Sequence, residues 1–161
     1  MGVALATGMF IVIMGIFFLI ALAASVLTII GRWKVFEKAG KPGWAAIVPY
    51  YNTYVTYELG NFPPMLVFLT VGTTVIAFVT GFIEGAAGYN EVLLVPALIL
   101  SILLSMLSLA ISVIEVLVSI NIAKKFGKSA LYGLGIAFLP YVFYMMLGFD
   151  KTAVYTEEKT V

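Results

Sequence analysis

The sequence predicts an all-α protein that crosses a membrane several times, and three observations support this fold class. Hydrophobic residues make up 63% of the 161 residues and charged residues only 11%, whereas soluble domains are about half apolar and about a quarter charged. Four long apolar runs follow one another along the chain, and lipid is the solvent that such runs need. Lysine and arginine gather in the segments after the first and third runs, which is typical of cytoplasmic loops.

The first three apolar runs are each predicted to form a membrane-spanning helix. Residues 5–31 contain no charged side chain and are long enough to cross about 30 Å of hydrocarbon at about 1.5 Å per residue. No basic residue precedes this run, and it is longer than the core of a secretory signal, so we expect an uncleaved helix. Residues 62–83 form the second span, and residues 92–123 form a third that is long enough to tilt or protrude.

The fourth apolar run, residues 131–149, contains Pro140 and has two possible structures. If it crosses the membrane, the chain has about four transmembrane helices in one membrane domain, residues 1–161, with both termini outside the cell. A proline cannot donate a helical hydrogen bond, so the run can instead form a re-entrant hairpin that returns the polar tail, residues 150–161, to the cytoplasm. We expect the first of these two structures.

Residues 42–57, between the first two runs, are rich in aromatic side chains and are predicted to lie at the membrane surface. The segment contains Trp44 and four tyrosines. Tryptophan and tyrosine prefer the headgroup level because their rings are apolar while their N–H or O–H groups need polar partners. Pro49 interrupts any helix here, so we expect an interfacial or shallow re-entrant segment rather than a full span.

Basic residues at the ends of the apolar runs are predicted to anchor the chain at the lipid headgroups. Long basic side chains near a helix end reach the polar interface, and an excess of them marks the cytoplasmic side. The predicted anchors are six basic residues and one tryptophan: Arg32, Lys38, Lys41, Trp44, Lys124, Lys125 and Lys128.

Two Gly-Lys turns, at residues 40–41 and 127–129, look like the end of a phosphate-binding loop, but their context argues against a nucleotide. Such a loop needs another glycine five positions earlier and lies between a strand and a helix. Ile122 occupies that position in the second turn, and Pro42 replaces the required Ser or Thr in the first. A weak internal repeat of the transporter kind is another interpretation, but the unequal spacing to the next proline favours two simple turns at the membrane surface.

Two sequence blocks resemble those of a known family. The pattern W-x-V-F-E-K-A-G-K-P-G-W starts at Trp33, and the pattern A-K-x-F-G-K-S starts at Ala123 and leads into a proline-aromatic run that ends at Phe149. With these blocks the chain resembles an uncharacterised family of small bacterial multi-pass membrane proteins, a domain of unknown function. The resemblance implies a multi-pass architecture in the bacterial inner (cytoplasmic) membrane, and it implies no activity.

Polar residues recur along the third run at intervals of four, three, four, three and four positions. This period places them on one face of a helix, which we call the seam. Small residues let membrane helices approach closely, and their hydroxyl groups bond across the contact or back to their own helix. We therefore expect the seam to face protein. Its residues are Ser101, Ser105, Ser108, Ser112, Glu115 and Ser119.

Glu115 is the one acidic residue of the seam and lies deep in the predicted span. It precedes Lys124 by nine positions, or about 13 Å along a helix, which puts it near the middle of the membrane. A charged carboxylate is costly there, so it must be protonated, paired or hydrated. No Lys or Arg is predicted inside a span, so the expected partners are Thr28, Thr73, Thr74 or a second protomer. Glu115 has either a structural role or a role as a proton or ion site.

The residue types present restrict the chemistry. The chain has no cysteine and no histidine, which excludes thiol nucleophiles and Cys/His zinc sites. Ser129 follows Lys128, but neighbours in sequence point to different sides of a helix. We therefore expect no enzyme, no catalytic residue, no metal and no cofactor. Glu84, Asn90 and Glu91 in the outer loop could bind a cation weakly, although a solvated polar loop is the favoured interpretation.

These observations favour a small integral-membrane subunit or scaffold that assembles through the seam, with a second copy or with a larger membrane complex. The alternative is a small channel or a proton- or ion-coupled transporter that uses Glu115. In both cases the expected partner is the lipid bilayer together with other membrane subunits or a homo-oligomer. Nucleic acid is not expected, because a net charge of +1 provides no general attraction for it.

Overall fold

The computed structural model describes residues 2–87 and 91–157, and these residues form helices and no strand. Helices suit such apolar runs because lipid offers no hydrogen-bonding partner, so each backbone amide must bond within its own segment. The helices are α1 (Gly2–Lys38), α2 (Tyr51–Leu59), α3 (Val67–Ala87), α4 (Glu91–Lys125), α5 (Ala130–Phe138) and α6 (Pro140–Phe149). Two short 3₁₀ turns, η1 (Gly43–Ala46) and η2 (Pro64–Leu66), precede α2 and α3.

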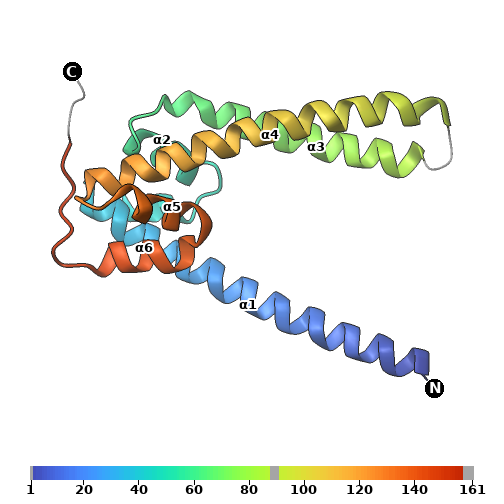
Figure 1. Cartoon of the computed structure of the whole chain (residues 1–161), viewed down its shortest axis with the longest axis horizontal. Helices are drawn as coiled ribbons and strands as arrows, with labels where there is room; N and C mark the ends of the chain where they lie inside the picture. The colour runs from blue at the N-terminus through green and yellow to red at the C-terminus, as the bar shows by residue number, and fades with distance from the viewer. Residues whose placement is uncertain (1, 88–90, 158–161) are drawn as a thin grey trace.

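The helices are arranged as a two-pronged fork (Figure 1). One prong is the antiparallel hairpin of α3 and α4, and the other is the N-terminal part of α1. At the base of the fork, α1 packs against α6 and η1, while α4 packs against α5. The base therefore brings together segments that are far apart in the sequence.

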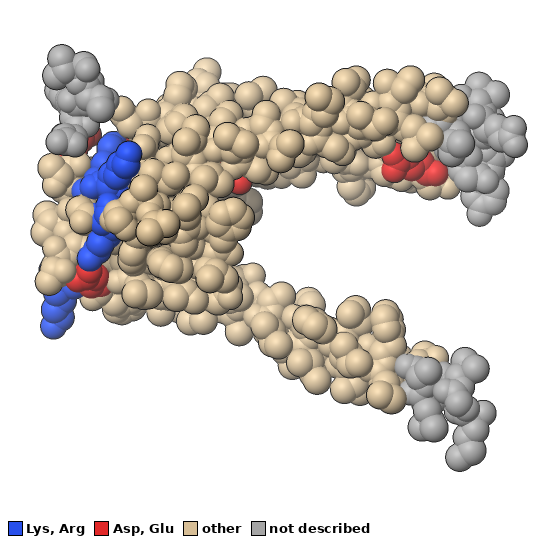
Figure 2. Space-filling model, in the orientation of Figure 1, with Lys and Arg blue, Asp and Glu red and all other residues tan. Residues whose placement is uncertain are grey.

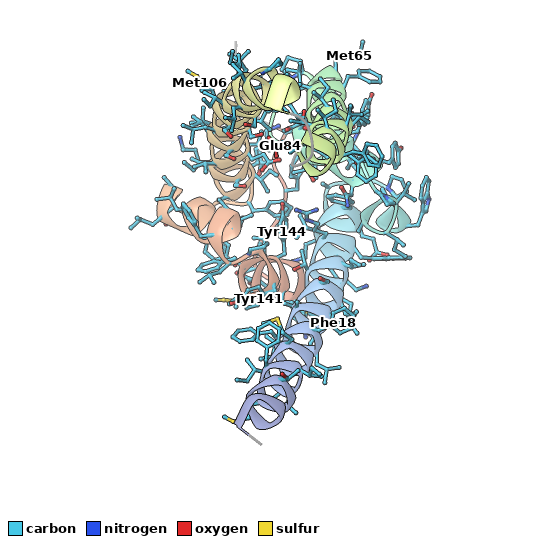
Figure 3. All side chains as sticks on the ribbon, turned by 90° about the vertical axis from the view of Figure 1, so that its right-hand side faces the viewer. Phe18, Met65, Glu84, Met106, Tyr141 and Tyr144 are labelled. Atoms are coloured by element: carbon cyan, nitrogen blue, oxygen red, sulfur yellow. The ribbon has the colours of Figure 1, made fainter. Side chains whose placement is uncertain are left out.

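The prongs have the apolar surface of membrane helices. Figure 3 shows Phe18 of α1 and Met106 of α4 on the outside of the helices, where they are 68% and 67% exposed, whereas Tyr144 lies between the helices. Water does not favour contiguous apolar surfaces of this size, and lipid does. Three helices of the described chain are long and apolar enough to cross a membrane: Thr7–Lys38, Pro64–Gly85 and Val95–Lys125. The predicted all-α class is confirmed, and these helices indicate a membrane protein.

The fourth predicted span, residues 131–149, is not confirmed. The chain bends at Leu139, where φ is −131° and ψ is 59°, and the run divides into α5 with 9 residues and α6 with 10. Each helix is only about 15 Å long, roughly half of the hydrocarbon thickness. Pro140 causes the division, because its ring clashes with the preceding helical turn and it lacks an amide hydrogen, whereas the first position of a new helix accepts it.

The tail returns to the base of the fork. The amide of Thr156 donates to the carbonyl of Lys125 at 2.9 Å, and Ala153 is buried. Figure 2 shows the visible Lys and Arg side chains gathered at the base together with some acidic ones, and a further acidic patch near the tip of the α3–α4 hairpin. The described part of the tail, residues 150–157, thus lies at the end that carries the basic turns. This is the arrangement of the re-entrant alternative and differs from that of a four-span chain.

The core lies in the base, where small residues allow α1 and α6 to meet closely. Val35, Ile122 and Leu147 are fully buried there. Gly31 of α1 faces Gly148 of α6, since a Cβ added to Gly148 would lie 2.9 Å from the Gly31 carbonyl oxygen. Such close helix contact through glycine is typical of membrane proteins, and it determines how α6 is held beneath α1.

The two Gly-Lys turns are identical helix ends. Gly40 and Gly127 both have a φ of 70°, a conformation that glycine adopts without strain. The amide of Lys41 donates to Phe36 O at 2.8 Å, and the amide of Lys128 makes the equivalent bond at 2.9 Å. These are the bonds of a helix-terminating Schellman motif. The turns therefore stop α1 and α4 at the base.

The aromatic segment consists of η1 and α2, separated by the break at Pro49. Trp44 stacks on Tyr51 with ring centroids 5.4 Å apart, and Tyr51 stacks on Tyr54 at 5.9 Å. All three rings are exposed, as a headgroup-level segment requires, and their depth in the membrane stays a prediction. Tyr57 differs from them, because it is buried in the core.

Candidate functional site

The structure divides the seam of α4 between two hollows. The outer three serines line a groove between α3 and α4, together with Thr80 and Glu84 of α3. The inner three residues line a cavity at the base of the fork. The outer set is Ser101, Ser105 and Ser108, and the inner set is Ser112, Glu115 and Ser119. The seam thus lines two open hollows, and four of its six residues, Ser105, Ser108, Ser112 and Glu115, are exposed.

The hydroxyl groups of the seam bond back to α4. Ser105 donates to Ser101 O at 2.8 Å, Ser112 to Ser108 O at 2.9 Å, and Ser119 to Glu115 O at 2.8 Å. This is the local alternative to bonding across a helix contact, and it leaves the hydroxyl oxygens free to accept.

The three threonines proposed as partners of Glu115 bond elsewhere. Thr28 donates to the Ala24 carbonyl of α1, and Thr73 and Thr74 donate to carbonyls of α3. Each hydroxyl group donates to a backbone carbonyl of its own helix, a local bond that is available without any contact with a neighbouring helix. The prediction that these threonines pair with Glu115 is therefore wrong in this structure.

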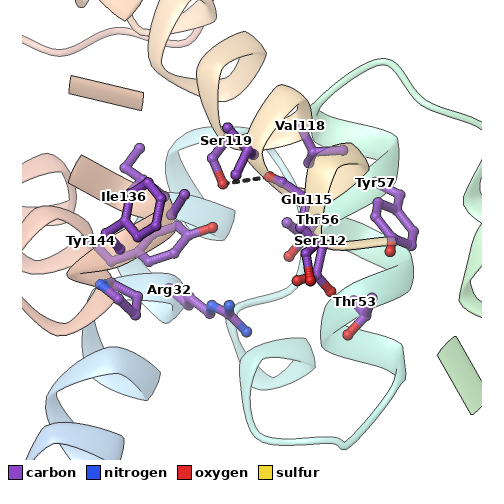
Figure 4. A pocket seen from close by; sticks show the side chains of 14 residues that line it. Arg32, Thr53, Thr56, Tyr57, Ser112, Glu115, Val118, Ser119, Ile136 and Tyr144 are labelled. Atoms are coloured by element: carbon purple, nitrogen blue, oxygen red, sulfur yellow. Dashed lines mark hydrogen bonds between the residues drawn. The ribbon is translucent and has the colours of Figure 1, made fainter. Parts of the chain in front are cut away.

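The cavity at the base has a volume of about 330 Å³, is lined by residues of α1, α2, α4, α5 and α6, and is open to the surface at Ser112 and Glu115, which are exposed. Its walls are of two kinds (Figure 4). Hydroxyl groups come from α2 and α4, including Thr53 and Thr56, and apolar side chains come from α5 and α6, including Ile136 and Pro140. Two charged residues complete it: Arg32 from α1 and Glu115 from α4.

Arg32, one of the predicted anchors, lines the cavity, and its position relative to the headgroups stays a prediction. It lies six residues before Lys38, which corresponds to about 9 Å along α1, and its side chain lines the cavity. The guanidinium carbon lies 5.0 Å from the centre of the Tyr144 ring, a cation–π contact. Its Nε is buried and has no hydrogen-bond partner among the described residues. Because α1 continues as one helix past residue 31, the apolar helix that is long enough to cross a membrane, Thr7–Lys38, includes Arg32.

Arg32 and Glu115 face each other without touching. Both side chains line the same cavity, yet among the described residues no ion pair of 4.0 Å or less joins them. No hydrogen bond from the described part of the chain reaches the carboxylate oxygens either. Two opposite charges with a space between them form a site that a polar guest can complete.

Residues 44–158 match the model of a family of unknown function, DUF5684. The chain belongs to this family. The resemblance seen in the sequence is thereby confirmed at the level of an uncharacterised domain family. No curated protein and no solved structure matches the chain. The matched residues of this DUF5684 protein include Glu115, whereas Arg32 precedes them, so α1 contributes one wall of the cavity from outside the matched segment.

The remaining basic anchors of the DUF5684 protein tie the base together. Lys38 Nζ donates to the carbonyl oxygens of Leu147 and Asp150 at 2.7 and 2.6 Å, which satisfies the end of α6. Lys41 forms an ion pair with Glu58 at 2.6 Å. Lys125 lies over the ring of Tyr155, with its Nζ 5.6 Å from the centre, and Lys124 is exposed. Their role at headgroups stays a prediction.

Lys128 and Asp150 connect the second Gly-Lys turn to the tail. Lys128 Nζ donates to the Asp150 carboxylate, and the Thr152 hydroxyl and amide donate to its other oxygen at 2.6 and 2.8 Å. These bonds hold the pKa of the Asp150 carboxyl well below its usual range, and the bond from Lys128 contributes most to this lowering. Ser129, next to Lys128, accepts a bond from the amide of Tyr132 and caps α5.

The outer groove contains one residue of the cation site considered for the loop. Glu84 lines the groove with the seam serines. Asn90 and the side chain of Glu91 lie outside the described residues, so that site stays a prediction. The cavity with Arg32 and Glu115 is therefore the candidate functional site. Sequence reasoning found Glu115 and missed Arg32, although six helical positions between Arg32 and Lys38 already indicate that Arg32 lies deeper.

Proposed function

We propose that this DUF5684 protein is a small membrane transporter or channel whose cargo binds between Arg32 and Glu115. A single observation carries the proposal: two opposite charges face each other across a cavity, unbridged, next to helices suited to a membrane. Ionisable residues in such positions are costly and mark substrate, ion or proton pathways. A structural pair would gain more from direct contact, because each charge would then satisfy the other.

The seam supports a pathway along α4. The groove and the cavity follow one another on the same helix face, and their nearest seam residues, Ser108 and Ser112, are one turn or about 6 Å apart. Glu84 lies at the outer end of this path. A small movement of α3 or α5 against α4 would connect the two hollows, as alternating access requires. We place the protein in the bacterial inner membrane with its basic base on the cytoplasmic side.

Proton flux into proteoliposomes tests the proposal. The purified protein is reconstituted with a pH-sensitive dye inside the vesicles, and a pH gradient is applied across the membrane. We expect flux in the wild type, loss of that flux in the Glu115→Gln variant, and normal flux in the Glu58→Gln variant. Glu58 is the matched control, because its carboxylate pairs with Lys41 at the base and does not line the cavity. No flux in the wild type, or equal flux in both variants, contradicts a proton channel or a proton-coupled transporter that uses Glu115.

A membrane subunit or scaffold is the second candidate, and the free length of α1 supports it. Phe10, Phe17 and Phe18 are 62–68% exposed, and the prong that carries them diverges from the α3–α4 hairpin. A helix of a second copy or of another subunit would pack there, in place of lipid. The native complex, isolated from the membrane and weighed by mass spectrometry, tests this. A monomer without partners contradicts it.

A further inference from the structure

The cavity has a donor end and an acceptor end, and this polarity restricts its guest. Arg32 provides the donor end. A guanidinium group has five N–H donors and no acceptor; the Nε of Arg32 is buried, so the terminal nitrogens are the donors that a guest can reach. The ring of Tyr144 holds the guanidinium at 5.0 Å from its centre, so its orientation is set before a guest arrives. The planar fork of such a group fits a carboxylate, which accepts two parallel bonds.

The acceptor end surrounds Glu115. The hydroxyl groups of Ser112, Thr53 and Thr56 also line the cavity. Each has already donated its hydrogen within its own helix, at 2.9, 3.0 and 2.7 Å respectively. Their oxygens can therefore only accept, as the Glu115 carboxylate does. An ammonium group, with three N–H donors and a positive charge, is complementary to this end of the cavity.

Besides its donor end and its acceptor end, the cavity has an apolar wall, and its volume is small. Ile136 and Pro140 contribute it from α5 and α6. A volume of about 330 Å³ is at the lower limit of ligand pockets, which range from about 300 to 1,000 Å³. The guest is therefore small and carries a short aliphatic part.

We propose that the cavity binds a small zwitterion with an ammonium group, a carboxylate and a short aliphatic side chain, the class of the aliphatic α-amino acids. The carboxylate lies against Arg32, the ammonium group against Glu115, and the aliphatic part against the apolar wall. This assignment rests on the proposed function, because it specifies the cargo of the same cavity.

Three probes test the assignment by isothermal titration calorimetry on the purified full chain in lipid nanodiscs. L-valine carries both charges, isobutylamine lacks the carboxylate, and isovalerate lacks the ammonium group. Each charged contact is worth at least about tenfold in affinity, so we expect L-valine to bind at least tenfold more tightly than either analogue. Equal affinity for the three probes, or no binding of L-valine at millimolar concentration, overturns the assignment.

Two variants locate the contacts. Arg32→Gln is expected to remove the preference for L-valine over isobutylamine, and Glu115→Gln the preference over isovalerate, while Glu58→Gln retains both. If a variant loses its helical circular dichroism signal, the comparison of the three probes on the wild type decides whether the cavity binds the zwitterion. Binding of L-valine with neither proton flux nor uptake of radiolabelled L-valine in proteoliposomes supports the assignment and contradicts transport. Flux that depends on Glu115 without L-valine binding supports transport and overturns the assignment.

Discussion

Substitution of Gly31 by alanine tests the packing that forms the cavity. A Cβ at this position would lie 2.6 Å from both the amide nitrogen of Met145 and the carbonyl carbon of Tyr144. Favourable contacts between heavy atoms are about 3.5–4.0 Å, so α6 must move by about 1 Å away from α1. These atoms belong to the backbone of α6, and no side-chain rotation relieves the clash. The displacement also shifts Tyr144 from beneath Arg32.

The cost of this overpacking is about 1–3 kcal/mol, and alanine recovers up to about 1 kcal/mol through its higher helix propensity. The net loss is therefore up to about 3 kcal/mol, which lowers the melting temperature by up to about 12 °C, at about 2–4 °C per kcal/mol for a chain of this size. Thermal unfolding of the purified protein, followed by circular dichroism in detergent, measures the shift.

Gly15→Ala is the matched control, because it makes the same change in the same helix. No heavy atom lies within 4 Å of a Cβ at Gly15, so its melting temperature should be equal to that of the wild type or slightly higher. If Gly31→Ala is as stable as Gly15→Ala, then α1 and α6 do not pack as described, and the argument for a cavity between them is refuted.

Two further predictions concern the base of the fork. The bond from Lys128 lowers the pKa of Asp150 in the folded state, so the stabilisation is present at neutral pH and is lost as the pH falls below the unfolded value of about 3.9. Asp150→Asn should therefore be less stable than the wild type at pH 7, and the difference between their melting temperatures should narrow as the pH falls from about 5 to about 3; a difference that does not change with pH contradicts this. Because the chain has no cysteine, single cysteines at exposed positions report the side of the membrane. Lys124→Cys and Thr156→Cys should react with an impermeant thiol reagent that is added on one side of the membrane, and Glu84→Cys with reagent added on the other side. If Thr156→Cys reacts from the same side as Glu84→Cys, the position of the tail at the base is wrong.

Local patterns in the sequence were sufficient for much of the fold. Long apolar runs need backbone bonding within the segment, so they predict helices regardless of their neighbours. The seam follows from spacing along a single helix, and the Gly-Lys turns follow from the conformational freedom of Gly40 and Gly127. Pro140 indicated a break in the fourth run. Whether that run crosses the membrane or turns back depends on contacts with α1 and α4, which local sequence does not contain.

The sequence by itself determined the helical membrane class and the polar face of α4, because each depends on residues within one helix. Only the tertiary structure decided that Arg32 lines the cavity. In the sequence it is the first charge after an apolar run, and the headgroups are the usual place for such a residue. Gly31 and Gly148 bring α6 close to α1, and Tyr144 then holds the guanidinium in the cavity. Arg32 and Glu115 are far apart in the sequence, so their opposite charges come to line one cavity only where α1 and α4 are brought together in the base.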